Sequence, residues 1–161
     1  MAEKRQRKPT RLFDVDYSSG GTFFLTICTK GRAGILSQIV GENVELMPCG
    51  KVAEKYLIQL NEFYEELSVE YYVIMPNHIH LLLEVAEREE RVLDGTARQH
   101  SAVSSFVSTF KRFCNKEIGE NIWQTSFYDH IVRDAKDYER HVNYILENPA
   151  RWQLDDLHIE R

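Results

Sequence analysis

The chain has 161 residues, enough for one domain with a hydrophobic core and short for two. It is 43% hydrophobic and 28% charged, as in ordinary soluble globular proteins, and no apolar run approaches membrane-spanning length. The formal net charge of −5 argues mildly against a nucleic-acid partner.

The N-terminus lacks the apolar stretch of a secretory signal, so we expect a cytoplasmic protein with no membrane contact. The three cysteines are odd in number, widely spaced and outside any CxxC pattern. They predict reduced thiols rather than a disulfide framework or a cysteine-bound zinc.

The charge is unevenly distributed, because residues 1–12 carry +4 and the rest of the chain therefore carries −9. The five cations of this segment, against Glu3, are Lys4, Arg5, Arg7, Lys8 and Arg11. The charges divide the chain into a basic arm at 1–12, which can contact phosphates, and a single domain at 13–161. A solvated, disordered terminus is the commoner outcome of such a composition.

The first half of the chain predicts four strands and one helix. Residues 22–29 are rich in β-branched and aromatic side chains and follow a turn cluster, which is typical of a buried strand. A weaker strand is expected at 44–47. Apolar residues at helical spacing predict a helix over 52–67. Strands at 69–75 and 78–85 then flank Pro76 and Asn77.

The second half begins with a charged segment without periodicity at 87–100, which predicts a mobile loop. A helix follows, with one apolar face from Val103 to Cys114. Residues 131–132 indicate a short strand, and Asp134 is the expected N-cap of a third helix that Pro149 ends. The pattern predicts an α+β sandwich with helices packed on a mostly antiparallel sheet.

Two histidines carry the first chemical signal. His78 and His80 are two residues apart in a predicted strand, so both project from one face while Ile79 points into the core. Paired imidazoles on a sheet form half of a metal site. The pattern alone is equally consistent with two surface or hydrogen-bonded histidines.

The third helix carries the second signal. At about 100° per residue, Tyr138, Val142, Ile145 and Leu146 form its core face. A second stripe lies to one side of that face and contains Asp137, His141, Tyr144 and Asn148. A tyrosine beside a metal can attack phosphorus, and Asn148, one turn later, can complete a three-ligand site. Taken alone, Tyr144 is more simply an amphipathic ring at the core's edge.

Four ordered segments resemble the REP-associated branch of the HUH single-tyrosine transposases, where U is a hydrophobic residue. They lie at 21–30, at 72–80 with the His78-Ile79-His80 motif, at 122–124 with 127–133, and at 144–149. The resemblance runs from about Arg11 to Asp155, nearly the whole chain.

This resemblance implies a ferredoxin-like or RRM-like fold and a metal-dependent enzyme that nicks and joins single-stranded or hairpin DNA. Mg²⁺ or Mn²⁺ would be bound by His78, His80 and Asn148, although insertion-sequence relatives usually carry glutamine at the last position. Tyr144 would form a 5′-phosphotyrosine link and release a 3′-hydroxyl. Family members act as monomers or homodimers.

Other residues are candidates for DNA contact. Lys111, Arg112 and Arg133 can bind phosphates, and the first two are equally consistent with a solvated helix face. Tyr128 and Tyr138 are weaker candidates for the nucleophile. Trp123, Phe127 and Trp152 can stack on bases, although buried aromatics are more common.

Two other functions remain open. His78, His80 and Glu84 follow the HxHxxxE spacing of a cupin, a small-molecule metalloenzyme, but cupins are all-β and this chain has three helical patterns. The third possibility is a catalytically idle DNA-binding regulator that keeps the fold.

Overall fold

The computed structural model describes residues 21–86 and 102–158. The expected basic arm at 1–12 and the expected loop at 87–100 lie outside these residues. Four described strands form an antiparallel sheet in the order β4-β5-β1-β6. Their bounds are β1 Gly21–Cys28, β4 Leu67–Ile74, β5 His78–Val85 and β6 Tyr128–Val132.

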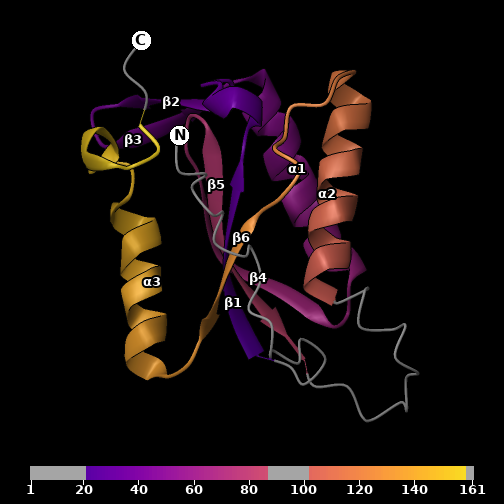
Figure 1. The fold of residues 1–161 in the computed structure, drawn as a ribbon, viewed down its shortest axis with the longest axis vertical. Helices are drawn as coiled ribbons and strands as arrows, with labels where there is room; N and C mark the ends of the chain where they lie inside the picture. Colours follow the sequence, from indigo (N-terminus) through magenta and orange to yellow (C-terminus); the bar gives the residue numbers. More distant parts are fainter. Residues whose placement is uncertain (1–20, 87–101, 159–161) are drawn as a thin grey trace, which may run out of the picture.

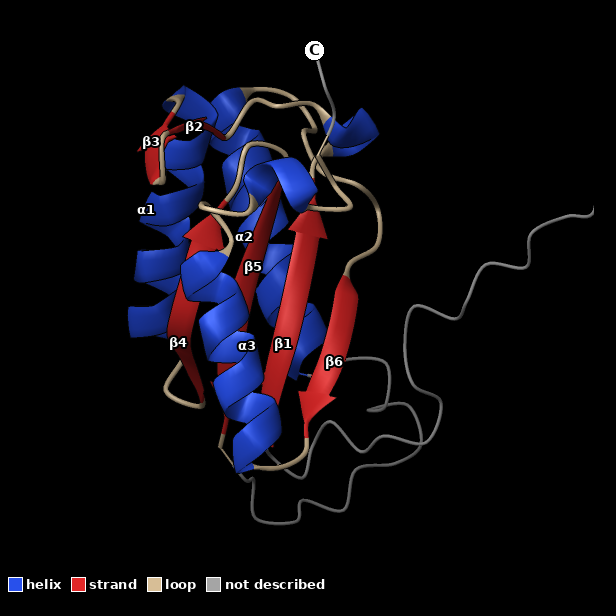
Figure 2. Cartoon of the chain, turned by 90° about the vertical axis from the view of Figure 1, so that its left-hand side faces the viewer, coloured by secondary structure: helices blue, strands red, loops and turns tan. Residues whose placement is uncertain are grey.

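Helices cover both faces of this sheet (Figures 1 and 2). Helix α1 (Pro48–Phe63) and helix α2 (Ala102–Ile118) lie on one face, and α3 (Ala135–Glu147) crosses the other. The central β1-α1-β4-β5-α2-β6 succession and strand order are ferredoxin-like. The predicted α+β class and its ferredoxin-like form are confirmed.

Short elements complete the described chain. A hairpin of β2 (Ser37–Val40) and β3 (Asn43–Leu46) precedes α1. Short 3₁₀ turns, η1 and η3, lie at Lys30–Arg32 and Trp152–Leu154. The sequence predicted the second hairpin strand near 44–47 and missed the first. No helix within the described ranges is long and apolar enough to cross a membrane.

Alternation along β5 divides its side chains between two cores. Ile79, Leu81 and Leu83 face α1 and α2, where they join the larger core with Phe106 and Phe110 of α2. Each of these side chains is almost fully buried, and burying one contributes about 1.5–3 kcal/mol. The intervening residues of β5 therefore face α3.

The smaller core lies under α3. Val73, Met75, Leu82 and Ile145 are buried there, with Tyr138 and Val142 packed against them. Leu146, also predicted for this face, is 63% exposed. The prediction is wrong because Leu146 lies about 100° beyond Ile145 around the helix.

Helix ends follow local rules. Pro48 occupies the first turn of α1, where a missing backbone N–H costs little, so the helix begins earlier than its apolar period predicts. The Asp134 side chain accepts a hydrogen bond of 2.8 Å from the Asp137 backbone N–H and caps α3 as predicted. Helix α3 ends at Glu147, just before Asn148 and Pro149.

Candidate active site

His78 and His80 lie on the α3-facing side of β5, in the middle of the sheet. Their ring centroids are 4.5 Å apart, and both residues are buried. Ile79 between them points into the larger core. The predicted sharing of one sheet face is therefore confirmed, because the two-residue period of the strand is maintained here.

Each histidine is oriented through its Nδ1 atom. Nδ1 of His80 lies 2.8 Å from Thr26 Oγ1, and Nδ1 of His78 lies 2.8 Å from Asn77 Oδ1. The Asn77 amide donates through Nδ2 to the carbonyl of Leu157, so its Oδ1 is left to accept from His78. This bond requires a proton on His78 Nδ1 and leaves the Nε2 lone pair free.

The Nε2 atoms of both rings are buried and lack a hydrogen-bond partner among the described residues. Burial lowers the pKa of His78 to about 4 and that of His80 well below its usual range. Both imidazoles are therefore neutral near pH 7, the form that binds metals. Buried polar atoms without partners are rare, and two adjacent ones on neutral imidazoles fit a pair of metal ligands.

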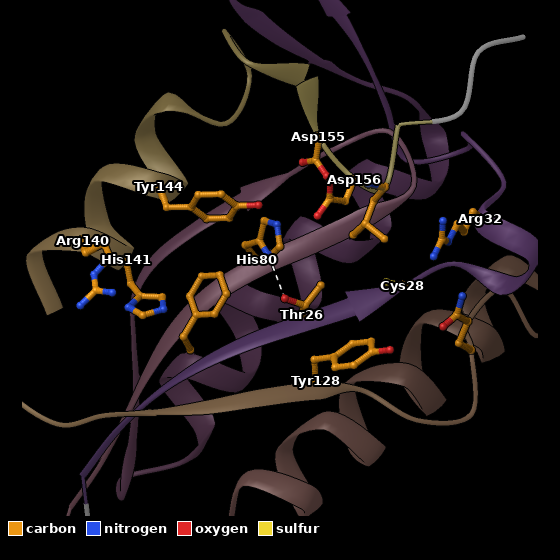
Figure 3. A pocket seen from close by; sticks show the side chains of 13 residues that line it. Thr26, Cys28, Arg32, His80, Tyr128, Arg140, His141, Tyr144, Asp155 and Asp156 are labelled. Atoms are coloured by element: carbon orange, nitrogen blue, oxygen red, sulfur yellow. Dashed lines mark hydrogen bonds between the residues drawn. The ribbon is translucent and has the colours of Figure 1, made fainter. Parts of the chain in front are cut away.

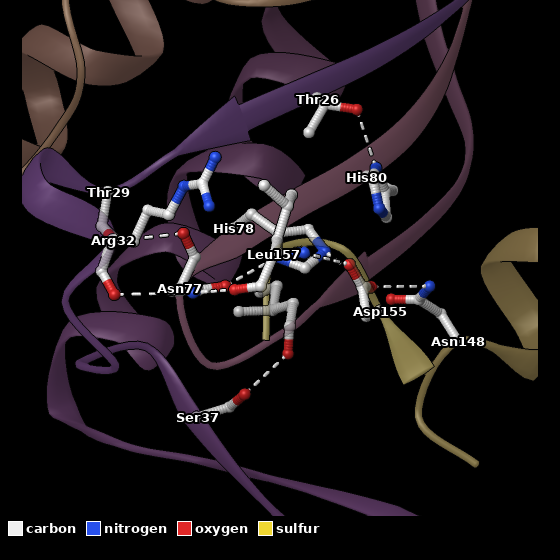
Figure 4. Close-up of polar contacts among 11 residues, drawn as sticks. Thr26, Thr29, Arg32, Ser37, Asn77, His78, His80, Asn148, Asp155 and Leu157 are labelled. Atoms are coloured by element: carbon white, nitrogen blue, oxygen red, sulfur yellow. Dashed lines mark hydrogen bonds and ion pairs between the residues drawn. The ribbon is translucent and has the colours of Figure 1, made fainter. Parts of the chain in front are cut away.

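Asn148 brings a third such atom to the site. Although it precedes proline, Asn148 keeps helical dihedral angles, φ −57° and ψ −42°. Its side chain is buried, and its Oδ1 has no partner among the described residues. Its Nδ2 donates to Asp155 Oδ2 over 3.2 Å. The predicted ligand atom thus lies beside the histidine pair (Figure 4).

Asp155 is a site residue that the sequence did not predict. It follows η3, its side chain is only 3% exposed, and its Oδ2 lies 3.6 Å from His78 Nε2. Ligand atoms of His78, His80 and Asp155 all lie within 4.8 Å of one another. Figure 4 shows these side chains pointing toward one another from β5 and the C-terminal segment.

The donor set fits a divalent cation. Amide and carboxylate oxygens suit Mg²⁺ and Mn²⁺, and the paired imidazoles favour Mn²⁺ of the two. The Asp155 carboxylate, which accepts from the Asn148 amide and the Leu157 backbone N–H, adds an oxygen ligand beside the two imidazoles.

Tyr144 lies on α3, directly over the site. Its ring packs edge-on against His80 at 5.1 Å and near Phe24 at 5.9 Å, and the residue is 44% exposed. Partial burial, reinforced by the Asp155 carboxylate, raises the pKa of the phenol. Its hydroxyl points over His80 and toward Asp155 (Figure 3).

These groups border a pocket of about 450 Å³ between α3, β1 and β6. His80, Tyr144 and Asp155 line it, together with Tyr128. Arg140 and Arg32 lie near opposite ends of the view in Figure 3. The pocket lining thus contains two cations as well as the carboxylates of Asp155 and Asp156.

A second cluster of ligand-type residues lies beside the pocket, formed by His130, Asp137 and His141. Here the ligand atoms are already paired. His130 Nε2 lies 2.8 Å from Asp137 Oδ2, and His141 Nδ1 lies 2.7 Å from the Asp137 carbonyl oxygen. His130 is the main reason that the pKa of Asp137 is lowered. The hydrogen bond between His130 and Asp137 connects β6 to α3.

Three basic residues in the second half of the chain were predicted to bind DNA phosphates, and their surroundings differ. The Lys111 ammonium donates to the carbonyls of Gln124 and Ser126, at 2.7 and 3.1 Å. Arg112 is exposed and lies over the Phe113 ring at 5.5 Å. Arg133 is exposed at the end of β6. Lys111 thus has a structural task that the sequence does not predict.

The remaining candidates from the sequence lie in different surroundings. Glu84 is exposed four residues beyond His80, about 13 Å along the strand, and an α+β sheet is not a cupin. Trp123 and Phe127 are buried in the larger core. Trp152 is half-buried beside His78, with ring centroids 5.9 Å apart. Tyr138, a residue of α3, packs against the smaller core between that helix and the sheet.

The described structure has a ferredoxin-like sheet with two histidines on a central strand and a tyrosine on a helix across the same face, as the sequence resemblance to single-tyrosine HUH transposases implies. Relatives agree with this class. The chain is 26% identical to the REP-associated tyrosine transposase of Escherichia coli K12, over 84% of this chain and 70% of that protein. It is 28% identical to an uncharacterised protein of Haemophilus influenzae, over 96% and 94% of the two chains.

The fold also matches a solved structure of a REP-associated tyrosine transposase bound to a REP hairpin. The TM-score is 0.65 at 24% identity, and the match covers 88% of this chain and 74% of that one. No protein-family model matches the chain. The chain is a homologue of the REP-associated tyrosine transposases.

Proposed function

We propose that the chain is a metal-dependent transposase that cleaves and rejoins single-stranded DNA beside a hairpin, through a 5′-phosphotyrosine intermediate. The observation that carries this proposal is the set of three buried, unpartnered ligand atoms under Tyr144. They are His78 Nε2, His80 Nε2 and Asn148 Oδ1, unpartnered among the residues that the structure describes.

These three residues, with Asp155, would hold Mg²⁺ or Mn²⁺. When bound, the cation would polarise the scissile phosphate and lower the cost of forming phenolate nearby. Thr26 and Asn77 orient the imidazoles before any ligand arrives. Such orientation by a second layer of residues raises metal affinity.

Tyr144 is the proposed nucleophile. Its phenol loses a proton, and the oxygen forms a bond to phosphorus while the bond from phosphorus to the 3′ oxygen breaks. That oxygen takes up a proton and leaves as a 3′-hydroxyl, which later attacks the phosphotyrosine to rejoin strands. Each step exchanges one phosphoester for another, so no nucleotide cofactor is required.

The proposed partner is single-stranded or hairpin DNA. The solved structure of similar fold is that of a REP-associated tyrosine transposase bound to a REP hairpin. Arg32 and Arg140 border the pocket here and would contact phosphates. We assign the same task to the basic arm at 1–12 and to Arg112 and Arg133.

One chain supplies every residue of the proposed site, because β5 carries the histidines and α3 the tyrosine. A monomer would therefore be active, and in a homodimer each subunit would use the tyrosine of its own α3. We place the enzyme in the cytoplasm, where its DNA substrate is.

The direct experiment is an oligonucleotide cleavage assay with Mg²⁺ or Mn²⁺, followed by mass spectrometry of the protein. We expect a covalent adduct and a free 3′-hydroxyl on the released strand. A protein that binds hairpin DNA with high affinity but forms no adduct under these conditions would be the catalytically idle regulator instead.

A further inference from the structure

One wall of the pocket has no task in the chemistry described above. Tyr128 lies on edge strand β6 and is 63% exposed, although its ring lines the pocket (Figure 3). Gln124, just before this strand, lines the same wall. Among the described residues, neither the Tyr128 ring nor the Gln124 side-chain amide has a stacking or hydrogen-bond partner. An exposed aromatic ring and a free amide are the groups that bind an unpaired base.

The register of the sheet places this wall close to the metal ligands. Thr26 of β1 pairs with His80 on one side and with Tyr128 on the other. Neighbouring strands lie about 4.8 Å apart, so the Cα atoms of Tyr128 and His80 are about 10 Å apart. A single nucleotide can span this gap, with its phosphate at the histidines and its base at Tyr128.

The backbone around Gln124 is held in place. Its N–H donates to the Cys28 carbonyl over 2.9 Å, and its own carbonyl accepts from Lys111 over 2.7 Å. The side chain therefore extends from a fixed backbone, and its unpaired amide is able to turn toward a base edge. It offers one acceptor and two donor hydrogens, so it can distinguish bases by their hydrogen-bonding edges.

The pocket is lined by two cations, Arg32 and Arg140, and by two carboxylates, one of them the proposed metal ligand Asp155. The two arginines would pair with the phosphates on either side of the bound base. We propose that Tyr128 and Gln124 form a binding site for one unpaired nucleobase next to the scissile phosphate, with Tyr128 stacking on the base and Gln124 setting the preference among bases. This inference rests on the proposed function, since the strand is the substrate.

The test is equilibrium binding of the full chain to a labelled hairpin with an unpaired extension, measured in EDTA so that cleavage does not intervene. Stacking on one base is worth about 1–3 kcal/mol, so Tyr128→Ala should weaken binding by about 5- to 150-fold. Tyr128→Phe, which keeps the ring, should bind nearly as well as the parent. Phe63→Ala is the matched control, because Phe63 is 74% exposed at the end of α1, away from the pocket.

An abasic residue is then placed at each unpaired position in turn. At one position the parent should lose affinity, and Tyr128→Ala should cost nothing further, as expected when both changes remove the same interaction. Gln124→Ala should change the preference among the four bases at that position.

Parental affinity for Tyr128→Ala, or an equal loss with every abasic oligonucleotide, would overturn the base site. An unchanged base preference in Gln124→Ala would contradict the role given to the amide. Failure of the proposed function appears differently, as a parent protein that binds the hairpin in EDTA but forms no adduct when metal is added.

Discussion

The Thr26 hydroxyl lies 2.8 Å from Nδ1 of His80, across the pairing of β1 with β5. If His80 binds metal through Nε2, its Nδ1–H donates to this hydroxyl. Thr26→Val keeps the shape of the side chain and removes the acceptor. We expect affinity for Mn²⁺ to fall by about 10- to 100-fold, measured by isothermal titration calorimetry.

Thr22→Val is the matched control for that variant, because Thr22 lies on the same strand and face, opposite Glu84. It should bind Mn²⁺ like the parent. Equal affinities for Thr26→Val and the parent would show that the hydroxyl does not orient His80 for metal binding.

Stability of the metal-free protein should depend on pH through the buried histidines. In the unfolded chain an imidazole titrates near pH 6.5, whereas burial lowers the pKa of folded His78 to about 4. Below about pH 6.5 the unfolded state therefore binds protons that the folded state does not. Neutral His78 makes its whole contribution to the free energy of unfolding above that pH. This contribution declines as the pH falls toward about 4.

Melting temperature in EDTA should accordingly fall between about pH 7 and about pH 5. His78→Gln should show a weaker dependence, because one of the two buried imidazoles is gone. If acid instead raised the melting temperature of the parent relative to that of His78→Gln, the conclusion that buried His78 is neutral would be wrong.

The structural role of Lys111 predicts a loss of stability on substitution. Lys111→Met keeps the aliphatic stem but leaves the carbonyls of residues 124 and 126 without their donor. We expect the free energy of unfolding to fall by about 1–3 kcal/mol in urea denaturation. Arg112→Met, on an exposed neighbour, should stay within about 0.5 kcal/mol. Unchanged stability with weaker DNA binding would make Lys111 a phosphate-binding residue instead.

The basic arm is predicted to act through phosphate charge. Deletion of residues 1–12 removes five cations, so single-stranded DNA should bind more weakly. The slope of log affinity against log salt should become shallower by roughly 0.7 for each phosphate that the arm neutralises in the parent complex. Cleavage of saturating DNA should survive. An identical salt slope would show that the arm does not bind DNA.

Much of the fold follows from local patterns. Alternation along 78–85 assigns His78 and His80 to one face, since a strand has a strict period of two. The stripe through Tyr144 and Asn148 follows from the helical period in the same way, and Asp134 is a local cap. Leu146 was misassigned because helical position alone does not show how wide a face the sheet covers.

Asp155 could not be predicted in this way. It lies beyond Pro149, where neither helical nor strand periodicity continues, and the η3 turn brings it to His78. The three-carbonyl surroundings of Lys111 are equally non-local, because they depend on how the chain after α2 returns along the helix. Contacts of this kind are set by tertiary packing, which one sequence does not display.

The central claim is that Tyr144 is the nucleophile, and its most direct test is peptide mapping of the protein–DNA adduct. Tyr144→Phe keeps the ring that packs on His80 and Phe24 but removes the attacking oxygen. Tyr138→Phe is the control, because Tyr138 packs in the smaller core on the same helix.

With Mn²⁺ and a cleavable hairpin, the parent and Tyr138→Phe should carry the DNA fragment on the peptide that contains residue 144. Tyr144→Phe should bind the hairpin with parental affinity and show no adduct on any peptide. A Tyr144→Phe protein that still becomes covalently linked to DNA would place the nucleophile elsewhere and contradict the account.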